Sequence, residues 1–538
     1  MNRASLRRTM TRASIAFLVA TFALQSPIAA QHSVVAADQW EAVLPDYQSF
    51  LEGQIEGDLS TYTVEATFIP ATAPDFAQIE GTLTLDWVNP SDAPVSEIPI
   101  RLYANDPRYR DGSIAISDVE IDGNDAEPVY AETDEIDVSI PLAEELDSED
   151  HVELTLTFVS TVPNDILSGY GMFSHDSPTD TYTLDHWLPL VAGYDPENGF
   201  ELDPVSQNGD PVFSTISYFD VTFTAPSEMV VASTGTESDS STQNGLTTSR
   251  YVSGPVRDFT FAISPNFEVA TGKADGVEIR SYYLPGHEER GEAVRDWTVT
   301  AIELFNDLIG PYPYEQLSVI DAPIGGGAAG IEFPQIIFIG SWYYDETLAN
   351  EGIPHGQEFT VVHEVLHQWW YGLVGNNQYQ HAFLDESLTN YLTTVYFERV
   401  YSEEVAQQQT LLNILAPYLI YLYGVGGTEH DDEVINTPTD AFSSELGYGV
   451  IIYNKGPLAF QAIREAMGDE SFFTAISGYF DANALHIAQP DDLLSAFEAE
   501  AAPGLDIDEV WQHWIEEANG KTDITLEDAL EILRSFGI

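Results

Sequence analysis

The chain of 538 residues contains no cysteine and few basic side chains. Without cysteine it has no disulfides, no thiolate metal site and no cysteine nucleophile. It carries 18 Lys and Arg against 88 Asp and Glu, which gives a formal net charge of −70. A surface this acidic repels nucleic acid and anionic membranes, so we expect neither as a partner. Lysine is the scarcest basic residue, and a salt-rich habitat is one hypothesis for this composition.

Long apolar runs are also missing, and the one notable stretch stands at the N-terminus. Residues Ala13 to Leu24 are apolar but short for a membrane span, and small residues follow around Ala29 and Ala30. Four arginines precede the apolar stretch: Arg3, Arg7, Arg8 and Arg12. This pattern predicts a secretory signal peptide over residues 1–30, and therefore a secreted or periplasmic protein. An uncleaved anchor is the alternative, and no later stretch of the sequence predicts a membrane span.

Hydrophobic periodicity divides the rest of the chain into two parts. After a mixed lead-in over residues 31–60, apolar and polar residues alternate in short runs such as Thr63 to Ile69 and Val152 to Phe158. Turn residues separate these runs, which predicts an all-β N-terminal domain over residues 61–272. The polar run from Thr236 to Thr248 is interpreted as a hairpin loop of this domain.

Strands and helices then follow one another in blocks. The pattern predicts a helix over residues 289–309, one strand over 331–339 and a helix over 388–400. We expect a second domain over residues 273–520 that mixes strands with helices, and a C-terminal helix within 521–538. The predicted fold class is therefore α+β multidomain, with an all-β domain before an α/β domain that ends in helices.

One stretch of the second part carries metal-binding chemistry. His363 and His367 are four residues apart, so a helix places both imidazoles on one face, as two ligands of one Zn²⁺ require. Glu364 lies between them, beside the open position of the metal, and Glu386 is placed to supply a third ligand. Two histidines, one carboxylate and one open position are typical of a catalytic zinc site, with one Zn²⁺ per chain. The alternative is an amphipathic helix whose histidines face solvent or the core.

Several motifs resemble those of one enzyme family. The histidine pair followed by Glu386 resembles the gluzincin pattern, the run Asp321 to Pro334 resembles the Gly-x-Met-Glu-Asn exopeptidase motif, and Tyr453 to Gly456 resembles Tyr-x-Lys-Gly. Upstream landmarks are similar too: Gly310 to Tyr314 and Arg257 to Phe259. The chain thus resembles the M1 family of zinc aminopeptidases, most strongly from about residue 213 to 514. The resemblance implies a thermolysin-like catalytic domain. The large C-terminal helical domain of long members does not follow here, so we expect a short form with an open cleft.

The resemblance also implies a role for each site residue. Zn²⁺, held by His363, His367 and Glu386, would lower the pKa of a bound water and polarise the scissile carbonyl. Glu364 would act as the general base, and the Tyr453 hydroxyl would stabilise the oxyanion.

Recognition of the substrate's amino end is assigned to a second set of residues. Glu332 would pair with a free α-ammonium group. Gly330 belongs to a glycine-rich loop that lets the substrate backbone approach closely, and Tyr448 would support Tyr453.

Two departures from the family pattern concern this amine site. Ile331 and Phe333 replace the Met and Asn of the exopeptidase motif. The second acidic anchor of the β domain is not recognisable, and Asp185, in roughly the right region, is interpreted as a loop aspartate. We therefore expect an exported metalloaminopeptidase acting on peptides with a free N-terminus. The alternatives are a broader peptidase with weak exopeptidase character and a non-catalytic surface or binding protein on the same scaffold. The sequence leaves the oligomeric state and the preferred N-terminal side chain open.

Overall fold

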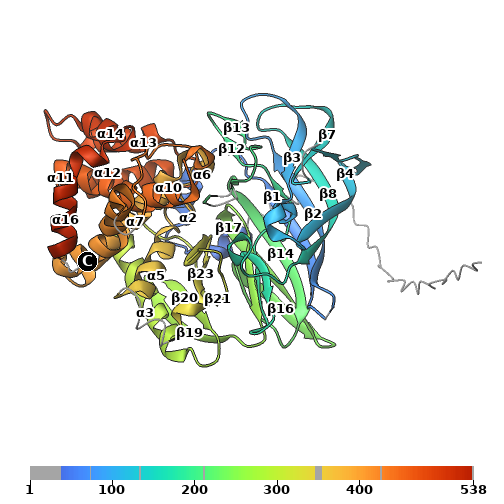
Figure 1. Cartoon of the computed structure of the whole chain (residues 1–538). Coiled ribbons are helices and arrows are strands. Elements are labelled where there is room, and N and C mark those ends of the chain that lie inside the picture. The colour runs from blue at the N-terminus through green and yellow to red at the C-terminus, as the bar shows by residue number, and fades with distance from the viewer. Residues whose placement is uncertain are drawn as a thin grey trace, which may run out of the picture.

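The computed structural model describes residues 38–535, apart from 73, 132–134, 207, 210–212, 346–353 and 425–426. The predicted signal peptide over residues 1–30 lies outside the described residues. Strands dominate the N-terminal half of the chain and helices the C-terminal half, and the two halves pack side by side (Figure 1). This arrangement confirms the predicted fold class of an α+β multidomain protein.

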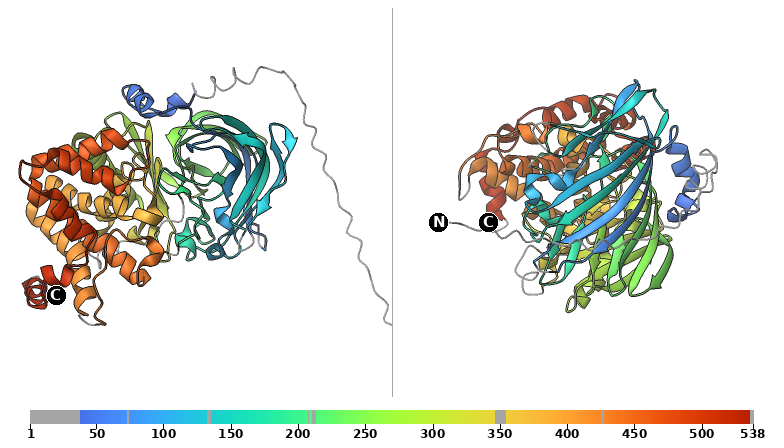
Figure 2. Two further views of the ribbon diagram at one scale, coloured as in Figure 1. Left: turned by 90° about the horizontal axis from the view of Figure 1, so that it is seen from above. Right: turned by 90° about the vertical axis from the view of Figure 1, so that its right-hand side faces the viewer.

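Alternating side chains build the largest sheet of the strand-rich half. In β1 (Thr61–Ile69), Val64, Ala66 and Phe68 are buried while the residues between them face solvent. Eight strands form this sheet, which curves around the strand-rich half (Figure 2). Their order is β16 (Thr236–Gln243), β17 (Leu246–Val256), β14 (Ser217–Pro226), β1, β2 (Ala77–Val88), β8 (His151–Val162), β4 (Ser113–Ile121) and β5 (Asn124–Asp125). Only the β1–β14 pair is parallel among these described strands.

Smaller sheets complete the strand-rich half. One contains β15 (Val230–Ser233), β18 (Phe261–Ser264), β10 (Thr181–Leu184) and β9 (Phe173–Asp176). A second contains β11 (Leu190–Val191), β3 (Val95–Arg101), β7 (Asp137–Leu146) and β6 (Val129–Tyr130), and β12 (Tyr194–Asp195) pairs with β13 (Gly199–Phe200). The prediction of a loop from Thr236 to Thr248 is wrong, because this polar run forms β16 and the start of β17, which pair as a hairpin. Its turn is at Asn244 and Gly245, which both have positive φ.

A five-stranded sheet opens the second half. Its order is β19 (Glu268–Ala274), β20 (Val277–Tyr283), β21 (Gln316–Ala322), β23 (Ile336–Gly340) and β22 (Gly330–Phe333). The predicted single strand over 331–339 is wrong, because β22 and β23 are antiparallel and Gln335 turns the chain between them with φ 65°. β22 is therefore an edge strand. β19 crosses the predicted domain limit at residue 272 and pairs in this sheet; the predicted domain limits themselves stay predictions.

Helices cover this sheet and fill the rest of the second half. α3 (Glu288–Leu308) packs on β19 and β20, and α5 (Gly356–Leu366) packs on β22 and β23 between α3 and α7 (Leu388–Val400). The other α-helices of the described residues are α6 (Gln378–His381), α8 (Glu403–Thr410), α9 (Ala416–Tyr423), α10 (Glu445–Val450), α11 (Gly456–Met467), α12 (Asp469–Asn483), α13 (Pro490–Glu500), α14 (Ile507–Ile515), α15 (Gly520–Asp523) and α16 (Leu526–Ser535), with α2 (Gln48–Gln54) in the lead-in.

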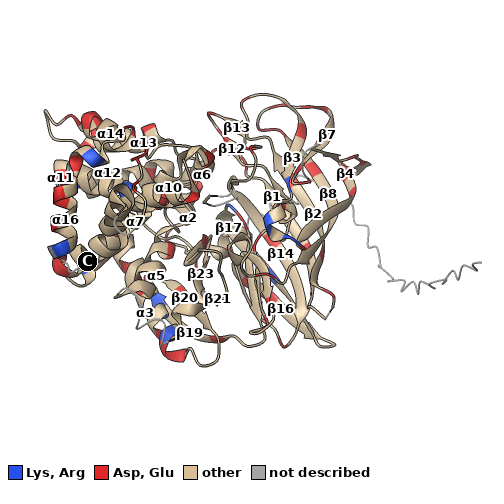
Figure 3. Cartoon of the chain, viewed as in Figure 1, with Lys and Arg blue, Asp and Glu red and all other residues tan. Residues whose placement is uncertain are grey.

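Charge is distributed over both halves. Acidic residues occur on strands and helices alike, and basic residues are sparse (Figure 3). Within the described part of the chain, no helix combines the length and the apolar character that crossing a membrane requires.

Candidate active site

The histidine motif lies on a helix that the core holds in place. In α5, Val361, Val362 and Val365 are fully buried, so the apolar face of the helix is fixed against its neighbours. His363 lies in the last turn of α5. His367 is the C-terminal cap residue of the helix and is fully buried. The packing of the apolar residues therefore directs both imidazoles to the same side of the helix.

Three predicted ligands converge at this helix. Nε2 of His363 lies 3.2 Å from Nε2 of His367 and 3.2 Å from Oε2 of Glu386. Nε2 of His367 lies 3.4 Å from the same carboxylate oxygen. These donor atoms come from α5 and from the π-helical segment η6 (Phe383–Ser387), which precedes α7. The structure thus brings together the two histidines and the glutamate that the sequence proposed.

The chemistry of this donor set fits a zinc ion. Nδ1 of His367 donates to the carbonyl oxygen of Trp370 at 3.0 Å, which leaves the lone pair of Nε2 directed at the other two donors. Burial alone would raise the pKa of Glu386, but the two imidazoles hold it well below its usual range. Two imidazole nitrogens and an ionised carboxylate are a typical Zn²⁺ ligand set.

Two further carboxylates lie beside these donors. Glu364, on α5, and Glu332, on β22, are both buried, with 4% and 7% of their surfaces exposed. Glu332, Glu364 and His367 each offer one ligand atom, and these atoms lie within 4.8 Å of one another. The predicted base and the predicted amine anchor are therefore neighbours, on the side of the donor set that faces β22.

Tyr453 reaches the site from another π-helical segment, η9 (Ile451–Lys455), between α10 and α11. Its hydroxyl donates to Oε1 of Glu386. Nδ2 of Asn390 donates to the Tyr453 carbonyl oxygen at 2.5 Å. Glu386 and Tyr453 both lie on π-helical turns, which occur often at functional sites because they shift side chains out of the α-helical register.

The segments that carry Glu386 and Tyr453 are coupled through their neighbours. The Ser387 hydroxyl donates to the Ile452 carbonyl oxygen at 2.6 Å. A Cβ atom at Gly456 would lie 2.0 Å from Oγ of Ser387, so glycine is required there. Lys455 is buried, pairs with Asp432 at 3.0 Å and donates to the carbonyl oxygens of Glu433 and Glu517 at 2.7 and 3.0 Å. These contacts anchor the Tyr453 segment to the C-terminal helices.

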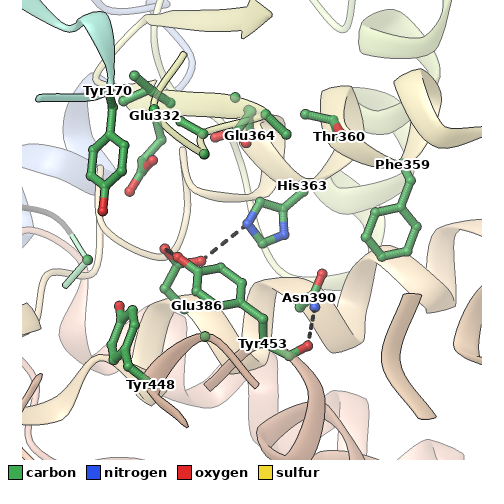
Figure 4. Close-up of a pocket in the computed structure, with 18 of the residues that line it drawn as sticks. Tyr170, Glu332, Phe359, Thr360, His363, Glu364, Glu386, Asn390, Tyr448 and Tyr453 are labelled. Atoms are coloured by element: carbon green, nitrogen blue, oxygen red, sulfur yellow. Dashed lines mark hydrogen bonds and ion pairs between the residues drawn. The ribbon is translucent and has the colours of Figure 1, made fainter. Parts of the chain in front are cut away.

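A single cavity joins these groups (Figure 4). Its lining contains every predicted site residue except His367: Gly330, Glu332, His363, Glu364, Glu386, Tyr448 and Tyr453. Sequence reasoning missed other lining residues, among them Tyr170, Phe359, Thr360, Asn390 and Glu445. Asn390 carried a usable signal, because it stands one helical turn after Glu386. Tyr170 comes from the strand-rich half and carried none.

Asp185 takes no part in this cavity's lining among the described residues. It is buried at the end of β10, where the Thr260 hydroxyl donates to it at 3.0 Å and Nε2 of His186 lies 2.8 Å away. These contacts make it a structural aspartate between β10 and the segment before β18.

Comparison with known proteins finds similarity to one family over part of the chain. Residues 295–514 match the model of the peptidase family M1 domain. The chain is 25% identical over 309 residues to Aminopeptidase M1-B of Oryza sativa subsp. japonica, covering 56% of the chain and 34% of that protein. It is 25% identical over 264 residues to Aminopeptidase N of Lactobacillus delbrueckii subsp. lactis, covering 48% of the chain and 30% of that protein. The matches thus span about a third of the length of these relatives.

The fold also matches solved structures. An M1 zinc metallopeptidase from Deinococcus radiodurans has a TM-score of 0.59 and 18% identity, covering 85% of this chain and 94% of its own. A variant of an M1 zinc metallopeptidase from the same organism, bound to a Tyr-Ser-Ala substrate, has a TM-score of 0.58 with the same identity and coverage. At this level of identity the similarity shows a shared fold.

Proposed function

Because the chain carries a peptidase family M1 domain, we propose that it is a zinc-dependent aminopeptidase that removes N-terminal residues from peptides. One observation carries the proposal: a histidine–histidine–glutamate donor set, a neighbouring carboxylate on the same helix, and a tyrosine hydroxyl converge in one cavity. A binding protein has no need of this combination, whereas hydrolysis of an amide uses each part of it.

One zinc ion per chain would be held by His363, His367 and Glu386. When bound, zinc supplies Lewis acidity, which lowers the pKa of water and polarises a carbonyl group. The Glu364 carboxylate accepts the proton of the attacking water and returns it to the nitrogen of the leaving peptide. The Tyr453 hydroxyl donates a hydrogen bond to the oxygen that gains negative charge. The contact of Asn390 with the Tyr453 backbone carbonyl and the reach of the Tyr453 hydroxyl to the Glu386 carboxylate support this role, because they hold the tyrosine beside the donor set.

Glu332 supports removal of residues from the amino end rather than internal cleavage. Its buried carboxylate lies on an edge strand, close to Glu364. A carboxylate here pairs with the α-ammonium of a substrate whose first peptide bond lies over Glu364. As the edge strand among the described strands of its sheet, β22 offers backbone groups along which an extended peptide can pair.

The proposal is tested by zinc content together with activity. We expect one zinc per chain by elemental analysis and hydrolysis of leucine p-nitroanilide, and we expect both to be lost in His363→Ala. His151→Ala is the matched control, because His151 is an exposed histidine on β8, remote from the cavity lining. A wild-type chain that binds one zinc and hydrolyses no peptide or aminoacyl substrate would favour a non-catalytic binding protein instead.

Export belongs to the same proposal and has its own test. The motivating pattern lies in residues 1–30, where arginines precede an apolar stretch. The expected result is a mature protein outside the cytoplasm whose N-terminal sequence begins near residue 31. Recovery of the intact N-terminus from the cytoplasm would contradict it.

A further inference from the structure

A short loop of the strand-rich half reaches into the cavity. Its 3-10 turn η4 (Gly169–Gly171) has three successive residues with positive φ, of 51°, 57° and 78°. Both glycines are required, because a Cβ atom would lie 2.3 Å from the Tyr109 ring at position 169 and 2.9 Å from the Ile166 carbonyl oxygen at position 171. The central residue, Tyr170, is not a glycine, yet it sits in the left-handed region, which is unfavourable for a residue with a Cβ atom. The Tyr170 side chain therefore occupies a backbone position that favours glycine, which is typical of residues with a function.

The loop is held against the glycine-rich loop before β22. The amide of Gly325 donates to the Tyr170 carbonyl oxygen at 3.1 Å. On the other side of the turn, Asp165 accepts from the Ser168 hydroxyl at 3.0 Å and pairs with Arg110 at 2.6 Å. These contacts fix the direction in which the Tyr170 ring projects.

The ring projects into the cavity at the end marked by Glu332. Figure 4 shows Tyr170 beside Glu332, with Tyr448 of α10 below it on the other side of the cavity. A substrate whose α-ammonium pairs with Glu332 carries its first side chain on the adjacent Cα atom. That side chain must therefore lie within reach of the aromatic walls that Tyr170 and Tyr448 form.

The charge of the lining adds a second selection. Four carboxylates line the cavity, those of Glu332, Glu364, Glu386 and Glu445, and the described lining residues include no lysine or arginine. The first three are assigned to the amine, the proton and the metal. Glu445 has no such role, and it stands one turn before Tyr448 on α10. An acidic substrate side chain meets repulsion here, while a guanidinium group meets both a carboxylate and an aromatic face.

We propose that Tyr170 is a specificity-determining residue, whose ring favours an arginine or aromatic N-terminal side chain over alanine or glutamate. This inference rests on the proposed function, since it takes Glu332 as the anchor of the α-ammonium. Stacking on one ring contributes about 0.5–2 kcal/mol. The expected preference that depends on Tyr170 is therefore about 2- to 30-fold.

The test measures binding separately from hydrolysis. The zinc-loaded full chain is titrated with the amides of arginine, phenylalanine, alanine and glutamate by calorimetry, at an ionic strength of about 0.3 M so that distant charges are screened. We expect the arginine and phenylalanine amides to bind more tightly than the other two. In Tyr170→Ala their affinities fall by about 2- to 30-fold relative to alanine amide, and kcat/KM for the matching p-nitroanilides falls in the same pattern.

Two further variants keep the result interpretable. Tyr170→Gly removes the ring but suits the left-handed backbone, so it shows the same loss in a loop without strain. Tyr130→Ala removes an exposed tyrosine of the strand-rich half outside the cavity and should keep the wild-type preference. Equal affinity losses for all four amides in both Tyr170 variants, or an unchanged preference, overturn the inference. Failure of the wild type to hydrolyse any of the four p-nitroanilides counts against the proposed function, while the amide titrations still decide the role of Tyr170.

Discussion

Gly330 and Glu364 are in such close contact that no side chain fits between them: a Cβ atom at residue 330 would lie 2.3 Å from Oε1 of Glu364 and 2.6 Å from its Cγ. Gly330 begins β22, which carries Glu332, and Glu364 lies on α5. The glycine thus sets how closely the strand of the amine anchor approaches the helix of the base. From the sequence, a glycine at position 330 was attributed to the close approach of a substrate backbone. The structure adds a second reason, which is the close approach of the Glu364 side chain.

Substitution Gly330→Ala is therefore expected to displace the Glu364 carboxylate while the metal ligands stay in place. We predict a fall in kcat of at least about 10-fold, because a base moved by about 1 Å loses its alignment with the attacking water. Zinc content should remain one per chain. Gly478→Ala is the matched control, since no atom lies within 4 Å of a Cβ added in that helix. Full activity in Gly330→Ala would mean that the close contact has no catalytic consequence.

Glu364→Gln tests the base itself. The amide keeps the size of the side chain but cannot accept the proton of water, so kcat should fall by about 10²–10⁴-fold. Zinc binding should persist, because the proposed ligands are His363, His367 and Glu386. Metal analysis and turnover of leucine p-nitroanilide are measured on the same sample. Retained turnover with normal zinc content would remove Glu364 from the mechanism.

Lys455 predicts a large effect on stability. Its ammonium group is buried against Asp432 and two carbonyl oxygens, and burial lowers the pKa of the lysine despite these partners. Lys455→Met leaves the buried Asp432 carboxylate without its cation, which costs about 3–5 kcal/mol. Urea unfolding should show this loss, and the double change Lys455→Met with Asp432→Asn should recover part of it. A single variant as stable as the wild type would contradict this account.

The pair of His287 and Asp321 predicts a pH dependence of stability. Nδ1 of His287 lies 2.6 Å from Oδ2 of the fully buried Asp321, and this hydrogen bond raises the pKa of His287. Since the folded pKa is above the unfolded value, the contribution is complete below about pH 6.5 and is lost as the pH rises through the folded pKa. We expect His287→Gln to lose about 1.5 kcal/mol at low pH and progressively less at higher pH.

The measurement is the difference in unfolding free energy between wild type and His287→Gln across pH, because other titrating groups cancel in that difference. A difference that grows with increasing pH would have the wrong sign for this pair and would refute the assignment.

Sequence periodicity predicted those elements whose burial pattern is local. The helix expected over residues 388–400 is α7 (Leu388–Val400), and the alternation of Thr63 to Ile69 became β1. The hairpin of β22 and β23 was missed because almost all residues of the two strands are buried, so their burial shows no period of two, and the turn at Pro334 and Gln335 was read as part of one strand. The polar β16–β17 hairpin was missed for the opposite reason, since its many exposed serines and threonines resemble a loop.

The candidate site shows the same limit. The histidine pair could be predicted because both ligands lie within one helical turn, and Glu386 was proposed beside it as the third ligand. Tyr453 and Glu332 were found only through a resemblance. The π-helical turns that aim Glu386 and Tyr453 have no sequence signature in this chain. Tyr170 was not predicted, since its place in the cavity depends on a contact between the two halves of the molecule.

The most direct test of the central claim compares a peptide that has a free N-terminus with its N-acetylated copy. The zinc-loaded wild type should hydrolyse the free peptide with a kcat/KM about ten- to a hundred-fold higher, because a charged hydrogen bond to a buried carboxylate contributes about 1.5–3 kcal/mol. Glu332→Ala should abolish most of this difference and leave hydrolysis of the acetylated copy largely as it was. Equal rates on the two peptides in the wild type, or a difference that persists in Glu332→Ala, would contradict the claim that this site recognises peptide amino ends through Glu332.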